Sequence, residues 1–176
     1  MVNFCLITVT YNNSIYIPYL IESIKKSATT SSFHLFINDN NSKDKDEIKS
    51  ICDNENNVTL IESKENFGFC KGNNIALQEA IKLNPKNILF INPDLFLTKN
   101  WLDTASGILE RDSSIGVLSG PLLHFDFNSK QATGLVDSLG INVTKYGKWF
   151  DIGQGKPTFG VDDIYPEAIC GALMLI

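Results

Sequence analysis

The sequence predicts an α/β domain with a mainly parallel central sheet flanked by helices and a less regular C-terminal part. The chain has 176 residues, the size of one compact domain, and 43% of them are hydrophobic, enough to form a core. Apolar runs alternate with segments of helical periodicity up to residue 112. Strands that are apolar throughout are typical of a parallel sheet covered on both faces.

The apolar runs that predict strands, each followed by a polar turn, cover residues 3–9, 33–37, 57–62 and 88–91. The first helix is indicated by four apolar residues at helical spacing, namely Ile17, Leu20, Ile21 and Ile24. The helices expected after the other three strands cover residues 44–53, 73–83 and about 100–111. Strand and helix therefore alternate four times.

The regular alternation ends after residue 112, where glycines and isolated apolar residues indicate loops and short strands. The chain stops in the apolar run 169–176 without a polar tail. Apolar ends of this kind normally continue into more structure or dock in a core. We therefore expect a truncated chain, and a homodimer formed through apolar surface near this run.

Composition and charge exclude several function classes. The net charge is -5 and the only arginine is Arg111, so a nucleic-acid partner is not expected. The four cysteines form no CxxC pair and have no metal-ligand spacing. No segment approaches the roughly 18 apolar residues that span a bilayer, and the N-terminus does not resemble a signal peptide.

Polar side chains follow all four predicted strands. In open α/β sheets, ligands bind beyond the carboxyl ends of the strands. The polar groups at these ends are Thr10-Tyr11-Asn12, Asp39-Asn40, Glu65-Asn66 and Asn92-Pro93-Asp94. The sequence therefore predicts a ligand site at this edge of the sheet.

Asp94 is the one carboxylate in the apolar stretch ILFINPDLFL, residues 88–97. An uncompensated charge buried there would cost several kcal/mol. One interpretation is a turn or helix-capping aspartate after Pro93. The other is a ligand of Mg²⁺ or Mn²⁺, which often binds through one or two carboxylates and substrate phosphates.

Three further motifs each allow two interpretations. Asp39 either closes an Asx-turn or accepts the N3–H group of a uracil or thymine ring. Thr10 and Tyr11 either end a strand or contact a nucleoside, with Tyr11 stacking near the base. The loop ENFGFCKGNN, residues 65–74, is either a tight turn with positive φ at Gly68 and Gly72, or a backbone that approaches a nucleotide, with Lys71 near a phosphate.

Four segments, in order along the chain, resemble family 2 glycosyltransferases with the Rossmann-like GT-A fold: VTYNNSIYIPYLIESI, FINDNNSKD, LIESKENFGFCKGNN and ILFINPDLFL. The similarity is greatest to the rhamnosyltransferase-like branch. Two later segments, VDSLGINVTKYGKWFDIGQG and ICGALMLI, also resemble that branch, so the resemblance covers essentially the whole chain.

The resemblance implies an inverting transfer of a sugar from a nucleotide-diphosphate donor to an acceptor hydroxyl. Residues 1–112 would form the donor-binding half, and residues 113–176 the start of the acceptor-side region. Asp94 would bind Mg²⁺ or Mn²⁺, which stabilises the departing diphosphate. The residues implied on the nucleotide are Thr10, Tyr11, Asn12, Asp39, Asn66, Gly68, Lys71, Asn74 and Asn92.

The same resemblance implies bacterial polysaccharide biosynthesis, a UDP- or dTDP-sugar such as dTDP-rhamnose, and a saccharide or lipid-linked saccharide acceptor. It also implies a cytoplasmic enzyme that works at the inner face of the membrane. The sequence departs from the family pattern at Asn92, where many relatives have an acidic residue. The family's general base lies downstream of the GALMLI-like strand, beyond Ile176, so the catalytic residue is unknown.

Two other functions are also compatible with the sequence. A non-catalytic nucleotide-sugar binding module would show no turnover even when the natural sequence is extended past Ile176. A sugar-phosphate nucleotidyltransferase would release pyrophosphate from a nucleoside triphosphate and a sugar phosphate. Its basic Gly-rich signature is expected directly after the first strand, where TYNNS stands instead.

Overall fold

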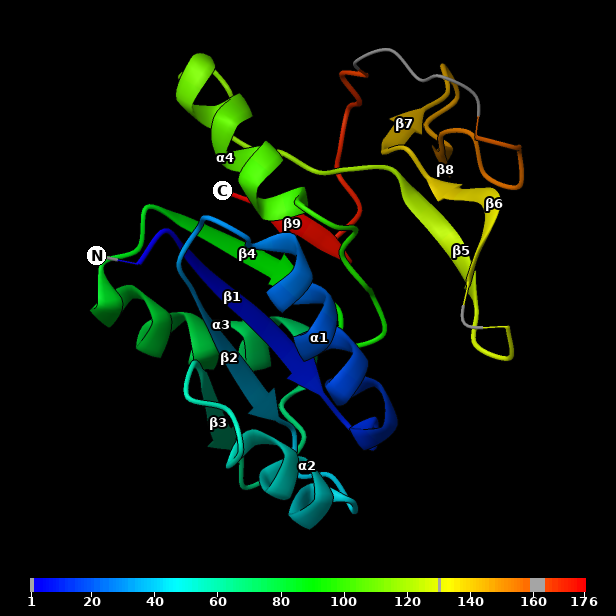
Figure 1. Cartoon of the computed structure of the whole chain (residues 1–176). Helices are drawn as coiled ribbons and strands as arrows, with labels where there is room; N and C mark the ends of the chain where they lie inside the picture. The colour runs from blue at the N-terminus through cyan, green and yellow to red at the C-terminus, as the bar shows by residue number, and fades with distance from the viewer. Residues whose placement is uncertain (1, 130, 159–163) are drawn as a thin grey trace. The chain divides into compact units, whose positions relative to one another are not determined.

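A computed structural model describes residues 2–129, 131–158 and 164–176 (Figure 1). Two compact units make up the chain: Met1–Leu118 with Leu175–Ile176, and Ser119–Met174. The predicted division at residue 112 falls within the first unit, shortly before its border. That the two parts hold a donor and an acceptor stays a prediction.

The first unit is built on a mainly parallel sheet with the strand order β3-β2-β1-β4-β9 (Figure 1). The strands are β1 (Phe4–Thr10), β2 (Phe33–Asp39), β3 (Val58–Glu62), β4 (Asn87–Ile91) and β9 (Leu173–Leu175). The first four pair in parallel, with β1 between β2 and β4. All four predicted strands are thus confirmed, and β2 continues two residues further than predicted because Asn38 and Asp39 keep pairing with β1 and β3.

The fifth strand comes from the end of the sequence. Ile88 and Ile176 exchange two backbone hydrogen bonds of 2.8 and 2.9 Å. Such an exchange between two opposite residues is the pattern of an antiparallel pair. Leu173 and Leu175 are buried, so the apolar run 169–176 docks in part against the sheet. The expected homodimer stays a prediction.

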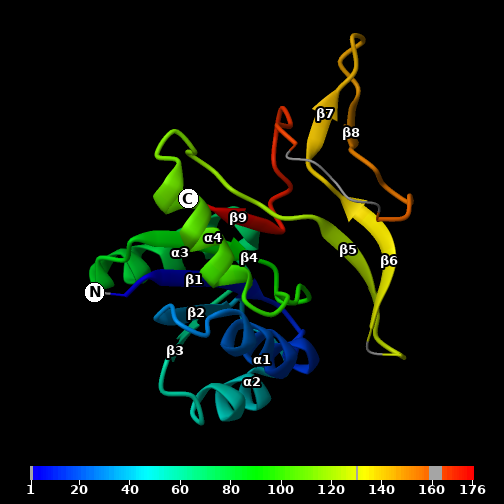
Figure 2. The ribbon, with the colours of Figure 1, turned by 45° about the horizontal axis from the view of Figure 1, so that its top comes forward.

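Helices cover both faces of this sheet, with α1 and α2 on one face and α3 on the other (Figures 1 and 2). The helices are α1 (Ile17–Ser27), α2 (Lys45–Cys52), α3 (Gly68–Ala80) and α4 (Trp101–Arg111), with short 3₁₀ helices η1 (Ser14–Tyr16) and η2 (Ile81–Leu83). The prediction for α3 is wrong at its start, because the helix begins at Gly68 rather than at residue 73. No helix among the described residues is long and apolar enough to cross a membrane.

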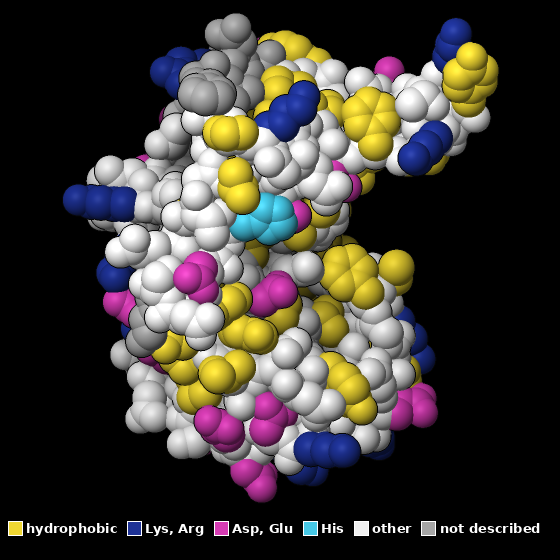
Figure 3. Space-filling model, turned by 90° about the vertical axis from the view of Figure 1, so that its right-hand side faces the viewer, with side chains coloured by type: hydrophobic (Ala, Val, Ile, Leu, Met, Phe, Trp, Pro, Cys, Tyr) yellow, Lys and Arg dark blue, Asp and Glu magenta, His cyan; other side chains and the backbone are white. Residues whose placement is uncertain are grey.

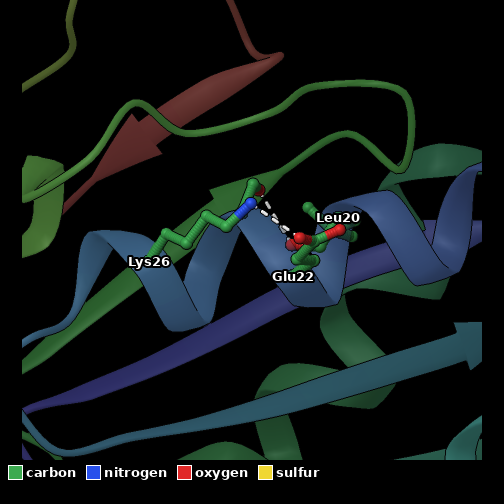
Figure 4. A network of polar contacts seen from close by, with 4 residues as sticks. Leu20, Glu22 and Lys26 are labelled. Atoms are coloured by element: carbon green, nitrogen blue, oxygen red, sulfur yellow. Dashed lines mark hydrogen bonds and ion pairs between the residues drawn. The ribbon is translucent and has the colours of Figure 1, made fainter.

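Helix α1 shows how the hydrophobic pattern builds the core. Its four predicted core residues, Ile17, Leu20, Ile21 and Ile24, are all buried. Each such side chain contributes about 1.5–3 kcal/mol when it leaves water. On the exposed side, Lys26 forms an ion pair with Glu22 at 2.6 Å (Figure 4). Surface pairs of this kind add little stability, so packing holds the helix in place.

The second unit contains loops and short strands, as the glycine-rich sequence predicts, and the strands pair antiparallel. Strand β5 (Leu122–Asp126) pairs with β6 (Gln131–Ser138), and β7 (Ile141–Val143) pairs with β8 (Trp149–Asp151). Several hydrophobic side chains of this unit are exposed, among them Tyr146 and Trp149.

Candidate functional site

The predicted site residues of the first unit follow the carboxyl ends of its parallel strands, which meet at one edge of the sheet. Thr10 at the end of β1 is the direct register partner of Asp39 at the end of β2. Strand β4 lies on the other side of β1, so Asn92 and Asp94 follow a strand that neighbours Thr10. On the face shown in Figure 3, Lys and Arg side chains are scattered between acidic and hydrophobic ones.

Thr10 and Asp39 are almost fully buried, at 0% and 1% exposure. The Asp39 carboxylate accepts hydrogen bonds from the backbone N–H group and the hydroxyl of Ser42. Asp39 therefore closes the turn that was one of its two interpretations. Because a carboxylate has about four acceptor positions, it keeps capacity for a further donor. The Thr10 hydroxyl has no hydrogen-bond partner among the described residues, a situation that costs about 1–3 kcal/mol.

The loop after β1 is held to the loop after β2. The Asn12 backbone N–H group donates to the Ser42 hydroxyl at 2.8 Å, and the Asn12 side chain accepts from the Lys43 N–H group at 2.8 Å. Asn12 has a positive φ of 57°, which asparagine tolerates better than most residues. These contacts give Asn12 a structural role in the loop, while its neighbour Tyr11 is 45% exposed.

Sequence reasoning missed a second link between these loops. The Ser14 backbone N–H group donates to the Asp44 carboxylate at 2.9 Å, and the Ser14 hydroxyl donates to Glu47 at 2.9 Å. Burial by itself raises the pKa of Asp44, but hydrogen bonds to its carboxylate, with those from Ser14 the largest, together outweigh burial and lower the pKa. The only sequence signal for this contact was the presence of Ser14 and Asp44 in polar turns, and the sequence does not indicate that these two residues pair.

The start of α3 contains the glycine-rich motif. Gly68 has a φ of +73°, as predicted, and its N–H group donates to the Asn66 side chain at 2.9 Å. The prediction of a positive φ at Gly72 is wrong, since Gly72 lies in the helix and is absent from the positive-φ residues of the described chain. A side chain there would clash with its surroundings, because an added Cβ would lie 2.9 Å from Cγ1 of Val9.

Two other predicted residues lie on the first turns of α3. Lys71 and Asn74 are both exposed. The Lys71 ammonium group lies 3.7 Å from the centre of the Phe67 ring, a cation–π contact. The helix N-terminus carries partial positive charge, and Lys71 adds to it. This end of α3 therefore favours an anionic ligand.

The expectation that Asp94 is partly buried is wrong, because its side chain is exposed. The Leu95 N–H group donates to the Asn92 carbonyl at 3.2 Å, which closes a turn with Pro93 at its second position. Proline favours this position, and the turn places Pro93 inside and Asp94 in solvent. A metal is therefore not required to make the carboxylate acceptable at this place.

The described residues contain no group of three or more His, Cys, Asp or Glu side chains arranged to hold a metal ion. Mg²⁺ and Mn²⁺ often bind through one or two carboxylates together with substrate phosphates. An exposed Asp94 at the edge that also holds the start of α3 fits a metal that arrives with a diphosphate. It does not fit a site formed by protein ligands alone.

The carboxylates of the final third do not reveal a general base. Asp137 lies 3.6 Å from His124, and Asp151 belongs to β8. Asp162 and Asp163 lie outside the described residues. Burial raises the pKa of the Cys5 thiol to about 11 and that of the Cys52 thiol to about 12.

The family model of glycosyl transferase family 2 matches residues 5–159. None of the curated proteins compared with the chain matches it. Among solved structures, S. aureus TarS 1-349 has a TM-score of 0.60 and 23% identity, over 81% of this chain and 42% of that chain. TarS 1-349 in complex with UDP-GlcNAc has a TM-score of 0.59 and 23% identity, over 76% of this chain and 38% of that chain.

A mannosyltransferase from Pyrobaculum calidifontis, PcManGT, in complex with GDP-Man and Mn²⁺, has a TM-score of 0.57 and 19% identity, over 68% of this chain and 35% of that chain. The chain thus spans well under half the length of these proteins. The family match and the shared architecture confirm the predicted GT-A, Rossmann-like fold. The rhamnosyltransferase-like branch stays a prediction.

Proposed function

The chain belongs to glycosyl transferase family 2, and from this premise we propose that it binds a nucleotide-diphosphate sugar at the carboxyl edge of its sheet, as the donor site of a glycosyltransferase. One observation carries the proposal. The buried Asp39 carboxylate, with acceptor capacity left, lies beside the unpaired Thr10 hydroxyl in the register of β1 and β2. In support, TarS and PcManGT share the fold and bind UDP-GlcNAc and GDP-Man, respectively.

The nucleoside occupies the ends of β1 and β2 in this proposal. Asp39 accepts the N3–H group of a uracil or thymine ring, and the Thr10 hydroxyl gains the partner that the protein does not provide. The half-exposed Tyr11 ring stacks against the base. Asn12 supports this side by holding the loop that carries Tyr11.

The diphosphate lies toward the start of α3. Backbone N–H groups and partial positive charge at a helix N-terminus bind phosphates, and Gly68 allows the backbone to approach closely. Lys71 contributes a full positive charge, which matters because the chain has only one arginine. The side chains proposed to line the ribose and diphosphate are Asn66, Lys71, Asn74 and Asn92.

Asp94 holds Mg²⁺ or Mn²⁺ in this proposal, with Asn92 beside it. The metal supplies Lewis-acid stabilisation of the charge that develops on the leaving diphosphate. An inverting transfer also needs a general base for the acceptor hydroxyl, a role that commonly adds 10²–10⁴-fold. No described residue is assigned that role.

The finer parts of the proposal rest on the motif resemblance. They are a UDP- or dTDP-sugar such as dTDP-rhamnose as donor, and a saccharide or lipid-linked saccharide as acceptor, in bacterial polysaccharide synthesis. A cytoplasmic location at the inner face of the membrane belongs to the same set. Turnover measured with a nucleotide-sugar donor and acceptor distinguishes an enzyme from a donor-binding module.

Calorimetric titration of UDP, dTDP and GDP, with and without Mn²⁺, tests the donor site. We expect metal-dependent binding of a pyrimidine diphosphate, weakened at least about tenfold in Asp94→Asn, which corresponds to about 1.4 kcal/mol. Asp53→Asn is the matched control, because Asp53 is also an exposed aspartate but follows α2, in a segment without a proposed site residue. Its affinity should equal that of the wild type.

Two results would contradict the proposal in different ways. Full metal-dependent binding by Asp94→Asn would remove Asp94 from the metal site. Absence of binding for all three diphosphates would refute a donor site in this chain.

A further inference from the structure

A series of hydrogen-bonded polar side chains, two of them buried, connects the ends of β2 and β3 with the start of α3. The Ser63 hydroxyl donates to Oδ1 of Asn38 at 3.0 Å, and Nδ2 of Asn38 donates to Oδ1 of Asn40 at 3.1 Å. Nδ2 of Asn40 then donates to the Gly68 carbonyl at 3.2 Å. Because every donor and acceptor in this series has a defined direction, both amide groups have a fixed orientation.

The last member of this series lies against the most unusual backbone of α3. Gly68 is the first residue of the helix and has a φ of +73°, and its N–H group is bound by Asn66. Asn40 binds the carbonyl of the same residue. Both polar groups of the Gly68 backbone are therefore held from outside the helix, which fixes where α3 begins.

The same network contacts α3 at a second point. An added Cβ on Gly72 would lie 3.0 Å from Nδ2 of Asn38, so the helix backbone packs closely on this amide. Asn38 and Asn40 are buried, at 0% and 3% exposure. Asn40 therefore contacts α3 at Gly68, and Asn38 contacts it at Gly72. Lys71 lies between these two glycines in the sequence, and its side chain is exposed.

We propose that Asn40 is a positioning residue for the diphosphate of the donor, acting through the Gly68 carbonyl. This inference rests on the proposed donor site. Asn40 itself does not contact the ligand. It sets the position of the first turn of α3, and with it the Gly68 backbone and Lys71. Nucleoside contacts at Thr10 and Asp39 do not pass through this hydrogen bond, so they should not depend on it.

The test uses Asn40→Asp, which keeps the acceptor for Asn38 but replaces the donor to Gly68 with a carboxylate oxygen. Asn41→Asp is the matched control, because it adds the same charge one residue further, at an exposed position. Ser63→Ala is a milder change, because it removes only the hydrogen bond from Ser63 to Asn38. If Asn40→Asp does not fold, Ser63→Ala alone provides the test.

UDP and dTDP are titrated into each protein with Mg²⁺, and the tighter ligand is compared with its nucleoside, uridine or thymidine, by ¹H–¹⁵N NMR. We expect Asn40→Asp to weaken diphosphate binding about tenfold and to change nucleoside binding less than about twofold. Ser63→Ala should show the same selectivity with a smaller loss. Asn41→Asp should bind both ligands as the wild type does.

Three outcomes would overturn the inference. Equal diphosphate affinities in Asn40→Asp and Asn41→Asp would show that the hydrogen bond to Gly68 is not needed. An equal loss for nucleoside and diphosphate would show a general effect on the fold. A wild-type protein that binds neither ligand would refute the donor site itself, and this inference with it.

Discussion

Gly72→Ala tests how closely α3 packs on the sheet beneath the candidate site. The added Cβ would lie 2.9 and 3.1 Å from the two Cγ atoms of Val9 and 3.0 Å from Nδ2 of Asn38. Carbon atoms pack best at about 3.5–4.0 Å, so these contacts are repulsive. Val9 is β-branched with a stiff χ1, and Asn38 is held by Ser63 and Asn40, so neither side chain moves freely.

The expected size of the effect combines two opposing contributions. Alanine in a helix interior is about 0.8–1 kcal/mol more favourable than glycine. Overpacking of this kind costs about 1–3 kcal/mol. We therefore expect Gly72→Ala to lower the free energy of unfolding by about 1 kcal/mol, with α3 displaced from β1 and weaker UDP binding.

Gly107→Ala is the matched control, because Gly107 also lies within a helix, α4, and has nothing within 4 Å of an added Cβ. Its free energy of unfolding should rise by about 0.5–1 kcal/mol. Urea unfolding followed by circular dichroism at pH 7 gives both values. If both variants are stabilised equally, the close packing of Gly72 on Val9 and Asn38 is refuted.

Two further predictions concern a surface contact and the nucleoside side of the site. Burial raises the pKa of Asp103, but hydrogen bonds from Thr29 and Ser31 hold it well below its usual range. The stabilisation from these hydrogen bonds is therefore fully present at pH values above the pKa of Asp103 in the unfolded chain, about 3.9. It is lost as the pH falls through the lower pKa of Asp103 in the folded protein. Asp103→Asn should lower the free energy of unfolding by about 1–2 kcal/mol at pH 7 and by less at pH 3, and equal losses would contradict this. Thr8 and Thr10 have buried hydroxyls without a partner among the described residues. Valine at either position should therefore raise stability by about 1 kcal/mol, but only Thr10→Val should weaken UDP binding in calorimetry, and unchanged affinity would remove Thr10 from the site.

The four parallel strands of the first unit were predictable because their signal is local. Each is an apolar run between polar turns, and burial on both faces of a parallel sheet requires such a run. The start of α3 was not predictable in this way. The segment GFCKG contains two glycines, which disfavour a helix by about 1 kcal/mol each. It becomes helical because Asn40 binds Gly68 and because Gly72 allows close packing on Val9.

The candidate site also has features that the sequence predicts and features that depend on the tertiary structure. The sequence by itself determined which polar residues follow the strands, since parallel strands bring their carboxyl ends to one edge. Only the tertiary structure decided which of them are buried, partnered or exposed. Asp94 looked buried among apolar neighbours, but the turn at Pro93 places it in solvent. The link from Ser63, directly after β3, to Asn38 in β2 was equally hidden, because a hydrogen bond between separate strand ends depends on register and packing rather than on neighbouring residues.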